Sequence, residues 1–298
     1  MADIARILCP VDFSEPSRHA LDQAVAIARW HGASVTVLHV VPPLGALAPA
    51  LGAPLYPPIA DSPGTLDDVR SELEAFVRTE GGAGVPVDVV VVIGTPATTI
   101  ADWSESSEAD LIVLGTHGRS GVERLLLGSV TERVLRRASC PVLTVPPRLP
   151  DAVPSGAVLF RHILCGIDFS PASERALAYA RSLAKEAELT ILHVMEAAMP
   201  RHDFAVSGAV HAATGHAGWS VAAQRLDDLI SADVTACGYG RELITSGKPC
   251  EQILRIAAQD AADLIVIGVH ERSSSFVSGS TTMRVVRNAT CPVLTLKA

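Results

Sequence analysis

The chain of 298 residues carries one set of motifs twice, in the same order. The first half contains Ile-Leu-Cys-Pro-Val-Asp-Phe-Ser, Leu-His-Val, Gly-Thr-Pro, Ala-Asp-Leu-Ile-Val-Leu-Gly and Cys-Pro-Val-Leu-Thr, and the second half repeats all five with few changes. The offset between copies drifts only from 156 residues at Ile7 and Ile163 to 151 at Cys140 and Cys291. So long a period suits a domain rather than a solenoid repeat. We therefore expect two copies of one fold.

A proline-rich stretch, Pro146–Gly156, separates the two copies. Such composition is typical of a linker between domains. We expect a first domain at residues 1–147, a linker at 148–160 and a second domain at 161–298.

Apolar runs and helical patterns alternate along the first copy. This order predicts an α/β fold with a parallel sheet, right-handed crossovers and helices on both faces. Ligands of such sheets bind beyond the carboxyl ends of the strands, where the strand order reverses. Asp12 and Gly115 would meet there if the first and fourth strands are neighbours. We expect strands at 6–12, 34–41, 87–93, 110–114 and 141–145, and helices from the Ser14 cap to 31 and at 65–79, 96–107 and 128–138.

A glycine-rich segment, Gly115–Ser129, follows the fourth strand and opens the last helix. Glycines let backbone N–H groups approach a ligand, and a helix start adds unpaired donors with a positive partial charge. These features favour an anion such as phosphate. The spacing of Gly115, Gly118 and Gly128 is neither a Walker loop nor the dinucleotide fingerprint. The alternative is a plain glycine-rich turn.

That spacing resembles the ATP-binding signature of the universal stress protein family. The resemblance covers nearly the whole chain as a tandem pair, and it is carried by Pro10–Ser14, Leu38–Val41, the glycine loop and Cys140–Val145. It implies two Rossmann-like domains of the adenine nucleotide α-hydrolase-like type, each with a five-stranded parallel sheet. It also implies ATP as the ligand, with or without Mg²⁺.

The resemblance assigns ligand contacts in the first copy. Asp12 would contact the ribose or adenosine side of ATP. The backbone near Val40 and Val41 would contact the adenine edge, and two groups of loop residues would contact the phosphates. The full set is Pro10, Val11, Asp12, Ser14, Val40, Val41, Gly115, His117, Gly118, Arg119, Gly128, Ser129, Val130 and Thr131.

Each of these assignments has a structural alternative. Asp12 could only cap a turn, and Ser129 could only be a helix N-cap, because the same geometry serves both purposes. His117 and Arg119 could be solvated loop residues. The hydroxyls of Ser129 and Thr131 would add donors to phosphate, and Arg119 could bind phosphate in a bidentate manner.

The second copy departs from this pattern in its glycine loop. Glu271 stands where the first copy has Gly118, and only the seven residues Arg272–Ser278 precede Gly279, against nine in the first copy. Asp168, the counterpart of Asp12, remains. A glutamate would repel a triphosphate, so we expect the second copy to bind ATP weakly or not at all, and to hold another ligand or serve as a packing partner.

Charge and composition narrow the list of partners. The formal net charge is −8 and no lysine and arginine block occurs, which argues against nucleic acid or an anionic membrane as the main partner. We find no signal-peptide pattern and no apolar run of about 18 residues, so the sequence predicts a cytoplasmic protein.

Neither the cysteines nor the histidines predict a metal centre. The six cysteines, which include Cys237 and Cys250, form no Cys-x-x-Cys pair. Cys9, Cys140, Cys165 and Cys291 are expected to be buried reduced thiols. The spacing of His202, Asp203, His211 and His216 matches no zinc pattern.

Three functions fit these observations. The leading one is a nucleotide-dependent stress-response regulator with no catalytic residues. The alternatives are a slow ATP hydrolase or phosphotransfer enzyme, with His117 as candidate base and Asp12 as candidate metal ligand, and a nucleotide-free scaffold. The final strands, 141–145 and 292–296, are expected at sheet edges, where they would pair the two copies as a pseudo-dimer. A further homodimer is left open.

Overall fold

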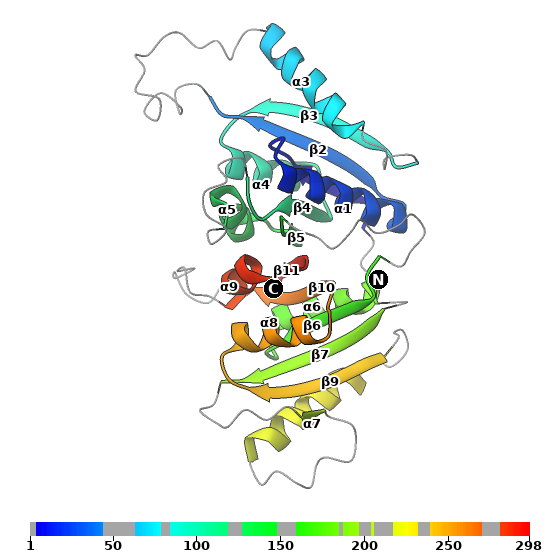
Figure 1. The fold of residues 1–298 in the computed structure, drawn as a ribbon, viewed down its shortest axis with the longest axis vertical. Coiled ribbons are helices and arrows are strands. Elements are labelled where there is room, and N and C mark those ends of the chain that lie inside the picture. The colour runs from blue at the N-terminus through cyan, green and yellow to red at the C-terminus, as the bar shows by residue number, and fades with distance from the viewer. Residues whose placement is uncertain are drawn as a thin grey trace. The chain divides into compact units, whose positions relative to one another are not determined.

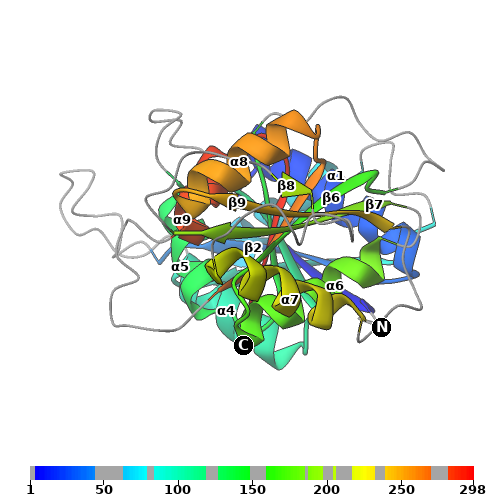
Figure 2. The same ribbon diagram turned by 90° about the horizontal axis from the view of Figure 1, so that it is seen from below.

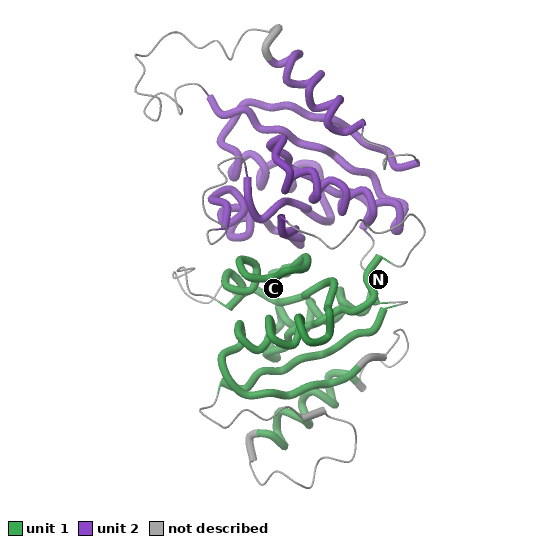
Figure 3. The backbone as a smooth tube through the Cα atoms, viewed as in Figure 1, with its two compact units in different colours: residues 1–2, 152–298 green, residues 3–151 purple. Residues whose placement is uncertain are grey.

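The computed structural model describes residues 4–43, 63–78, 84–118, 127–147, 159–184, 187–196, 204–205, 217–231, 239–269 and 281–298. The chain forms two compact units. We call residues 3–151 the N-terminal unit, purple in Figure 3, and residues 152–298, with 1–2, the C-terminal unit, green in the same view.

The N-terminal unit has the alternating order that the sequence predicts. Its parallel strands follow the order β3-β2-β1-β4-β5, with α1 and α3 on one face and α4 and α5 on the other (Figure 1). The elements are β1 Arg6–Pro10, α1 Glu15–His31, β2 Ser34–Val41, α3 Pro63–Val77, β3 Val87–Ile93, α4 Pro96–Ser106, β4 Leu111–Gly115, α5 Ser129–Arg137 and β5 Val142–Val145.

The core of this unit lies on both faces of the central strands. Cys9 of β1, Val37 of β2 and Val113 of β4 are fully buried, and every residue of β4 is buried. Strands covered on both faces by helices need apolar residues at successive positions rather than at alternate ones. This explains why the sequence shows continuous apolar runs.

The ends of α1 are set by the residues that the sequence indicates. Ser14 is the N-cap, with its Oγ accepting a hydrogen bond from the Ser17 N–H at 3.3 Å, and Pro16 occupies the first turn. Gly32 closes the helix in the left-handed region with φ of 70°, and its N–H bonds the Ala28 carbonyl. A residue with a side chain is strained at such a φ, which is why glycine ends the helix there.

The C-terminal unit repeats this plan. Its sheet has the order β11-β10-β6-β7-β9-β8, and α6 and α7 lie on one face with α8 and α9 on the other (Figure 2). The short β8 pairs antiparallel to β9 and was not predicted. The elements are β6 His162–Ile167, α6 Pro171–Leu183, β7 Glu188–Met195, β8 Phe204–Ala205, α7 Ala217–Ser231, β9 Tyr239–Ser246, α8 Pro249–Gln259, β10 Leu264–Val269, α9 Thr281–Asn288 and β11 Val293–Lys297.

The cysteines within the described ranges are free thiols. Cys9, Cys165, Cys250 and Cys291 are buried, and Cys140 is half-buried. Burial raises the pKa of the Cys140 thiol to about 11 and that of Cys165 and Cys291 to about 12. Cys237 lies outside the described residues.

The described residues contain neither a membrane-spanning helix nor a metal cluster. Each helix among them is too short or too polar to span a bilayer. They also contain no group of three His, Cys, Asp or Glu side chains placed to hold a metal ion. His202, Asp203, His211 and His216 lie outside these residues.

Candidate functional site

The strand order of the N-terminal unit reverses between β1 and β4. These strands are parallel neighbours, with Ile7 opposite Leu111 and Leu8 opposite Ile112. Their carboxyl ends therefore bring the segment after β1 beside the loop after β4. The contact is close: a Cβ atom on Gly118 would stand 2.6 Å from Asp12 Oδ2. Asp12 and the glycine loop thus lie side by side at the carboxyl ends of β1 and β4, as the sequence predicts.

A tight turn fixes Asp12 at the end of β1. Its Oδ1 accepts hydrogen bonds from the Ser14 N–H at 3.1 Å and from the Ser14 hydroxyl at 2.5 Å. Phe13, between them, has φ of 63°, a costly conformation for a bulky residue and one that is concentrated at functional sites. Asp12 is therefore a turn-forming residue through Oδ1, while Oδ2 lies beside Gly118.

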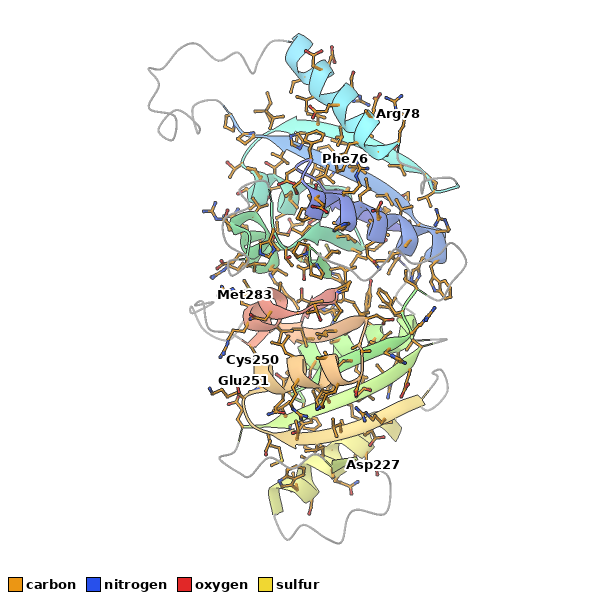
Figure 4. All side chains as sticks on the ribbon, viewed as in Figure 1. Phe76, Arg78, Asp227, Cys250, Glu251 and Met283 are labelled. Atoms are coloured by element: carbon orange, nitrogen blue, oxygen red, sulfur yellow. The ribbon has the colours of Figure 1, made fainter. Side chains whose placement is uncertain are left out.

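An aromatic cluster supports this turn from β2 and α3. The His39 Nδ1 atom lies 2.8 Å from the Val11 carbonyl oxygen, and the His39 ring packs 4.6 Å from Phe13. Phe76, labelled in Figure 4, meets Phe13 edge-on at 5.6 Å. Arg18 stacks 3.6 Å from the Phe76 ring and also donates to the Phe76 carbonyl. The cluster thereby links β1, β2, α1 and α3.

Backbone direction separates the roles of Val40 and Val41. The Val11 N–H donates to the Leu38 carbonyl on the β1 side at 2.9 Å, and the Gly94 N–H donates to the Val41 carbonyl from the β3 side at 3.0 Å. Since successive residues of a strand point their backbone groups to opposite sides, those of Val40 face β1. The β1–β2 pairing ends with Pro10 opposite Leu38. Val40 therefore presents its N–H and carbonyl beyond the end of β1.

Each of the three signature glycines is required for a different physical reason. A Cβ on Gly115 would stand 2.9 Å from the Pro16 carbonyl oxygen, so this glycine lets α1 pack against β4. Gly118 makes room for Asp12. Gly128 is the N-cap of α5, and its N–H donates to the Thr116 carbonyl at 2.8 Å. Of the alternatives for Ser129, the N-cap is wrong, because Gly128 holds that position.

The start of α5 offers backbone hydrogen-bond donors. The Glu132 N–H bonds the Gly128 carbonyl at 2.9 Å, so the N–H groups of Ser129, Val130 and Thr131 precede the first intrahelical bond. The buried Thr131 hydroxyl donates to the Gly115 carbonyl at 2.8 Å. The proton of this hydroxyl is therefore used within the fold, and the contact of Thr131 with phosphate stays a prediction.

His117 follows Thr116 in the segment after β4, and its Cα lies beside Gly128 at the start of α5. Its Nδ1 atom is 2.9 Å from the Thr116 hydroxyl oxygen, and its Nε2 atom is buried without a hydrogen-bond partner in the described part of the chain. Thr116 was not among the predicted site residues. Its only sequence signal is its place between Gly115 and His117, where the second copy has Val269. Arg119 lies outside the described residues.

The C-terminal unit repeats the turn closely. The Asp168 Oδ1 atom accepts from the Ser170 N–H at 3.1 Å and the Ser170 hydroxyl at 2.6 Å, and Phe169 has φ of 61°. His193 Nδ1 lies 2.8 Å from the Ile167 carbonyl oxygen.

Two differences separate the units at this point. The β6–β7 pairing continues one step further, to Ile167 opposite His193, a register that uses the Val194 N–H within the ladder. Val269 also replaces the hydroxyl of Thr116 by a methyl group. Glu271, Arg272–Ser278 and Gly279 lie outside the described residues.

Fold and site define a doubly wound α/β protein with a helix N-terminus and a carboxylate at the point where strand order reverses. The universal stress protein family model matches residues 4–146 and again 159–297. The chain therefore belongs to the universal stress protein family, as a tandem member.

Individual relatives agree with this assignment. Universal stress protein MJ0531 of Methanocaldococcus jannaschii is 36% identical over 47% of this chain and 81% of its own length. A universal stress protein of Mycolicibacterium smegmatis is 28% identical over 98% of this chain and 96% of its own. The crystal structure of a universal stress protein from Archaeoglobus fulgidus has a TM-score of 0.71 and 25% identity, covering 99% of this chain and 97% of that one.

Proposed function

We propose that the N-terminal unit binds ATP and that its occupancy makes the chain a nucleotide-dependent stress-response regulator. The observation that carries the proposal is the approach of Asp12 Oδ2 to Gly118 where β1 and β4 part. A carboxylate, the end of the β1–β2 pairing and a helix start all lie at the carboxyl ends of these strands.

Each part of the candidate site suits one part of ATP. The Val40 N–H and carbonyl form a donor and acceptor pair that complements the adenine edge. The Asp12 carboxylate accepts from ribose hydroxyls. The backbone N–H groups at the start of α5 suit the phosphates, because their positive partial charge is directed out of the helix. Any Mg²⁺ would be coordinated by phosphate oxygens rather than by a full set of protein ligands.

We propose domains at 1–147 and 161–298 with one nucleotide per chain. Two features oppose ATP in the C-terminal unit: Val194 uses its N–H in the β6–β7 ladder, and the sequence places Glu271 where the N-terminal unit has Gly118. The longer β6–β7 pairing removes a hydrogen-bond donor to the adenine base, and the glutamate repels phosphate.

Calorimetric titration with ATP tests the proposal on protein stripped of nucleotide. We expect one site per chain with a Kd in the micromolar range or below, which corresponds to about −8 kcal/mol or better. Asp12→Asn should weaken binding, whereas the matched Asp168→Asn should not. Sedimentation with and without ATP then measures assembly. Absence of saturation up to millimolar ATP, or two equivalent sites, would contradict the proposal.

A further inference from the structure

Thr116 is held rigidly at the end of β4. Its N–H donates to the Val145 carbonyl at 2.9 Å, and its carbonyl accepts from the Gly128 N–H at 2.8 Å. The residue is buried, with 3% of its surface exposed. Since the backbone is bonded on both sides, the position of the Thr116 hydroxyl is set by the sheet and by the start of α5.

That hydroxyl is placed to decide which nitrogen of His117 carries the proton. The Thr116 Oγ1 atom lies 2.9 Å from His117 Nδ1. A hydroxyl can donate or accept, and a neutral imidazole has one N–H and one acceptor nitrogen. If Thr116 donates to Nδ1, the ring proton must be on Nε2.

The second ring nitrogen of His117 is left without a hydrogen-bond partner among the described residues. His117 Nε2 is buried and has no hydrogen bond within the described ranges, which is unusual for a buried polar atom. The His117 Cα lies 3.7 Å from where a Cβ on Gly128 would stand, so the ring is attached beside the start of α5. An Nε2–H there would complete its bonding by donating to an anionic oxygen.

We propose that Thr116 is a positioning residue that fixes His117 as the Nε2–H tautomer, so that His117 donates a hydrogen bond to a phosphate oxygen of the nucleotide. The inference rests on the proposed function and adds a residue to it. The C-terminal unit keeps a histidine in its sequence, His270, but has Val269 in place of Thr116. The same buried position without its hydroxyl is therefore compatible with this fold.

The first measurement concerns the tautomer and needs no nucleotide. Imidazole ¹⁵N spectra of the full chain are recorded at about pH 8, where a free imidazole is neutral, and the His117 signals are assigned by their loss in His117→Gln. We expect the Nε2–H form in the wild type, a mixture in Thr116→Val, and recovery in Thr116→Ser. Thermal unfolding of the three proteins checks that each is folded.

The second measurement compares ATP with adenosine. Thr116→Val should weaken ATP binding roughly tenfold, the scale of one hydrogen bond to a charged group, and leave adenosine binding unchanged. Thr116→Ser should restore ATP binding. A wild type that binds no ATP overturns the proposed function itself. The Nδ1–H tautomer in the wild type, or equal losses for ATP and adenosine in Thr116→Val, overturns this inference alone.

Discussion

Asp12 Oδ2 lies 2.6 Å from the point at which a Cβ on Gly118 would stand, although 106 positions separate the two residues. No real Cβ approaches an oxygen so closely, so any side chain at position 118 displaces the carboxylate. Oδ1 of the same group is bonded to the Ser14 N–H and hydroxyl. The glycine therefore matters for where the carboxylate stands.

Gly118→Ala should reduce nucleotide affinity without unfolding the protein. The atom in the way is the far end of a side chain, which can rotate, so we expect the free energy of unfolding to change by less than about 1 kcal/mol. Rotation would move the carboxylate away from the ribose and weaken ATP binding about tenfold. Calorimetric titration and urea unfolding of the same preparation measure both quantities, and unchanged affinity would remove Asp12 from the site.

Gly115→Ala should have the opposite profile. The added Cβ would meet the Pro16 carbonyl oxygen at 2.9 Å, and backbone cannot rotate away as a side chain can. We expect a loss of about 1–3 kcal/mol in the free energy of unfolding, as for other overpacked sites. Gly268→Ala is the matched variant in the C-terminal unit, where the Cβ would lie 2.5 Å from the Ser173 nitrogen. Urea unfolding of both variants tests this, and wild-type stability in either one would contradict the packing role.

Ser14→Ala should separate stability from binding when compared with Ser170→Ala. Both serines are N-caps that also bond the preceding aspartate, so each variant should lose about 1 kcal/mol of stability. Only Ser14→Ala should also weaken ATP binding, because it removes the hydroxyl hydrogen bond to Asp12 Oδ1 and leaves the backbone N–H as the one bond from residue 14 to that carboxylate. Equal binding losses in both variants would indicate that the C-terminal unit binds nucleotide too.

The strands and helices of the N-terminal unit could be predicted because apolar runs, caps and glycines are local signals. Strands β2 and β3 match their predicted ranges, while β1 ends at Pro10 rather than Asp12, because its pairing with β2 stops at Pro10 opposite Leu38. The sequence could also predict that Asp12 meets the glycine loop, because a parallel sheet brings strand ends together.

The detailed roles at the site could not be predicted from local patterns. Whether the backbone groups of Val40 or those of Val41 point to the β1 side of β2 depends on the pairing of the strands, which only the three-dimensional structure shows. The Thr131 hydroxyl bonds the Gly115 carbonyl, 16 residues away, so its use could not be known from the helix alone. Thr116 belongs to no recognisable motif. Its role depends on the distance between its hydroxyl oxygen and the His117 Nδ1 atom, which the order of residues alone does not determine.

His193 should make the protein less stable in acid. Burial lowers the pKa of His193 below its ordinary value of 6.5, and the nearby Arg225 acts in the same direction, against the Ile167 carbonyl and Asp168. Below pH 6.5 the unfolded chain therefore binds more protons than the native one, so stability falls as the pH decreases.

The comparison variant is His193→Asn, which keeps a donor for the Ile167 carbonyl but cannot titrate. Urea unfolding between about pH 5 and 8 should show a steeper acid loss in the wild type, by at most about 1.4 kcal/mol per pH unit for one group. Parallel curves for the two proteins would show that His193 titrates alike in both states.

Cys140 should make the protein less stable in alkali. Burial raises the pKa of its thiol from the ordinary 9.0 to about 11, with Asp110 and Glu105 contributing and a Ser104 hydrogen bond opposing. Between these values the unfolded chain has lost the proton that the native protein keeps, so stability is complete below pH 9 and falls as the pH approaches 11. Each such thiol contributes at most about 1.4 kcal/mol per pH unit.

The comparison variant is Cys140→Ser, which retains a hydroxyl partner for Ser104 and does not ionise in this range. Urea unfolding under reducing conditions should therefore show a shallower alkaline loss of stability in the variant. Cys165 and Cys291, whose pKa values burial raises to about 12, account for part of the loss that remains. An identical slope in wild type and Cys140→Ser would mean that the Cys140 thiol ionises as readily in the folded protein as in the unfolded chain.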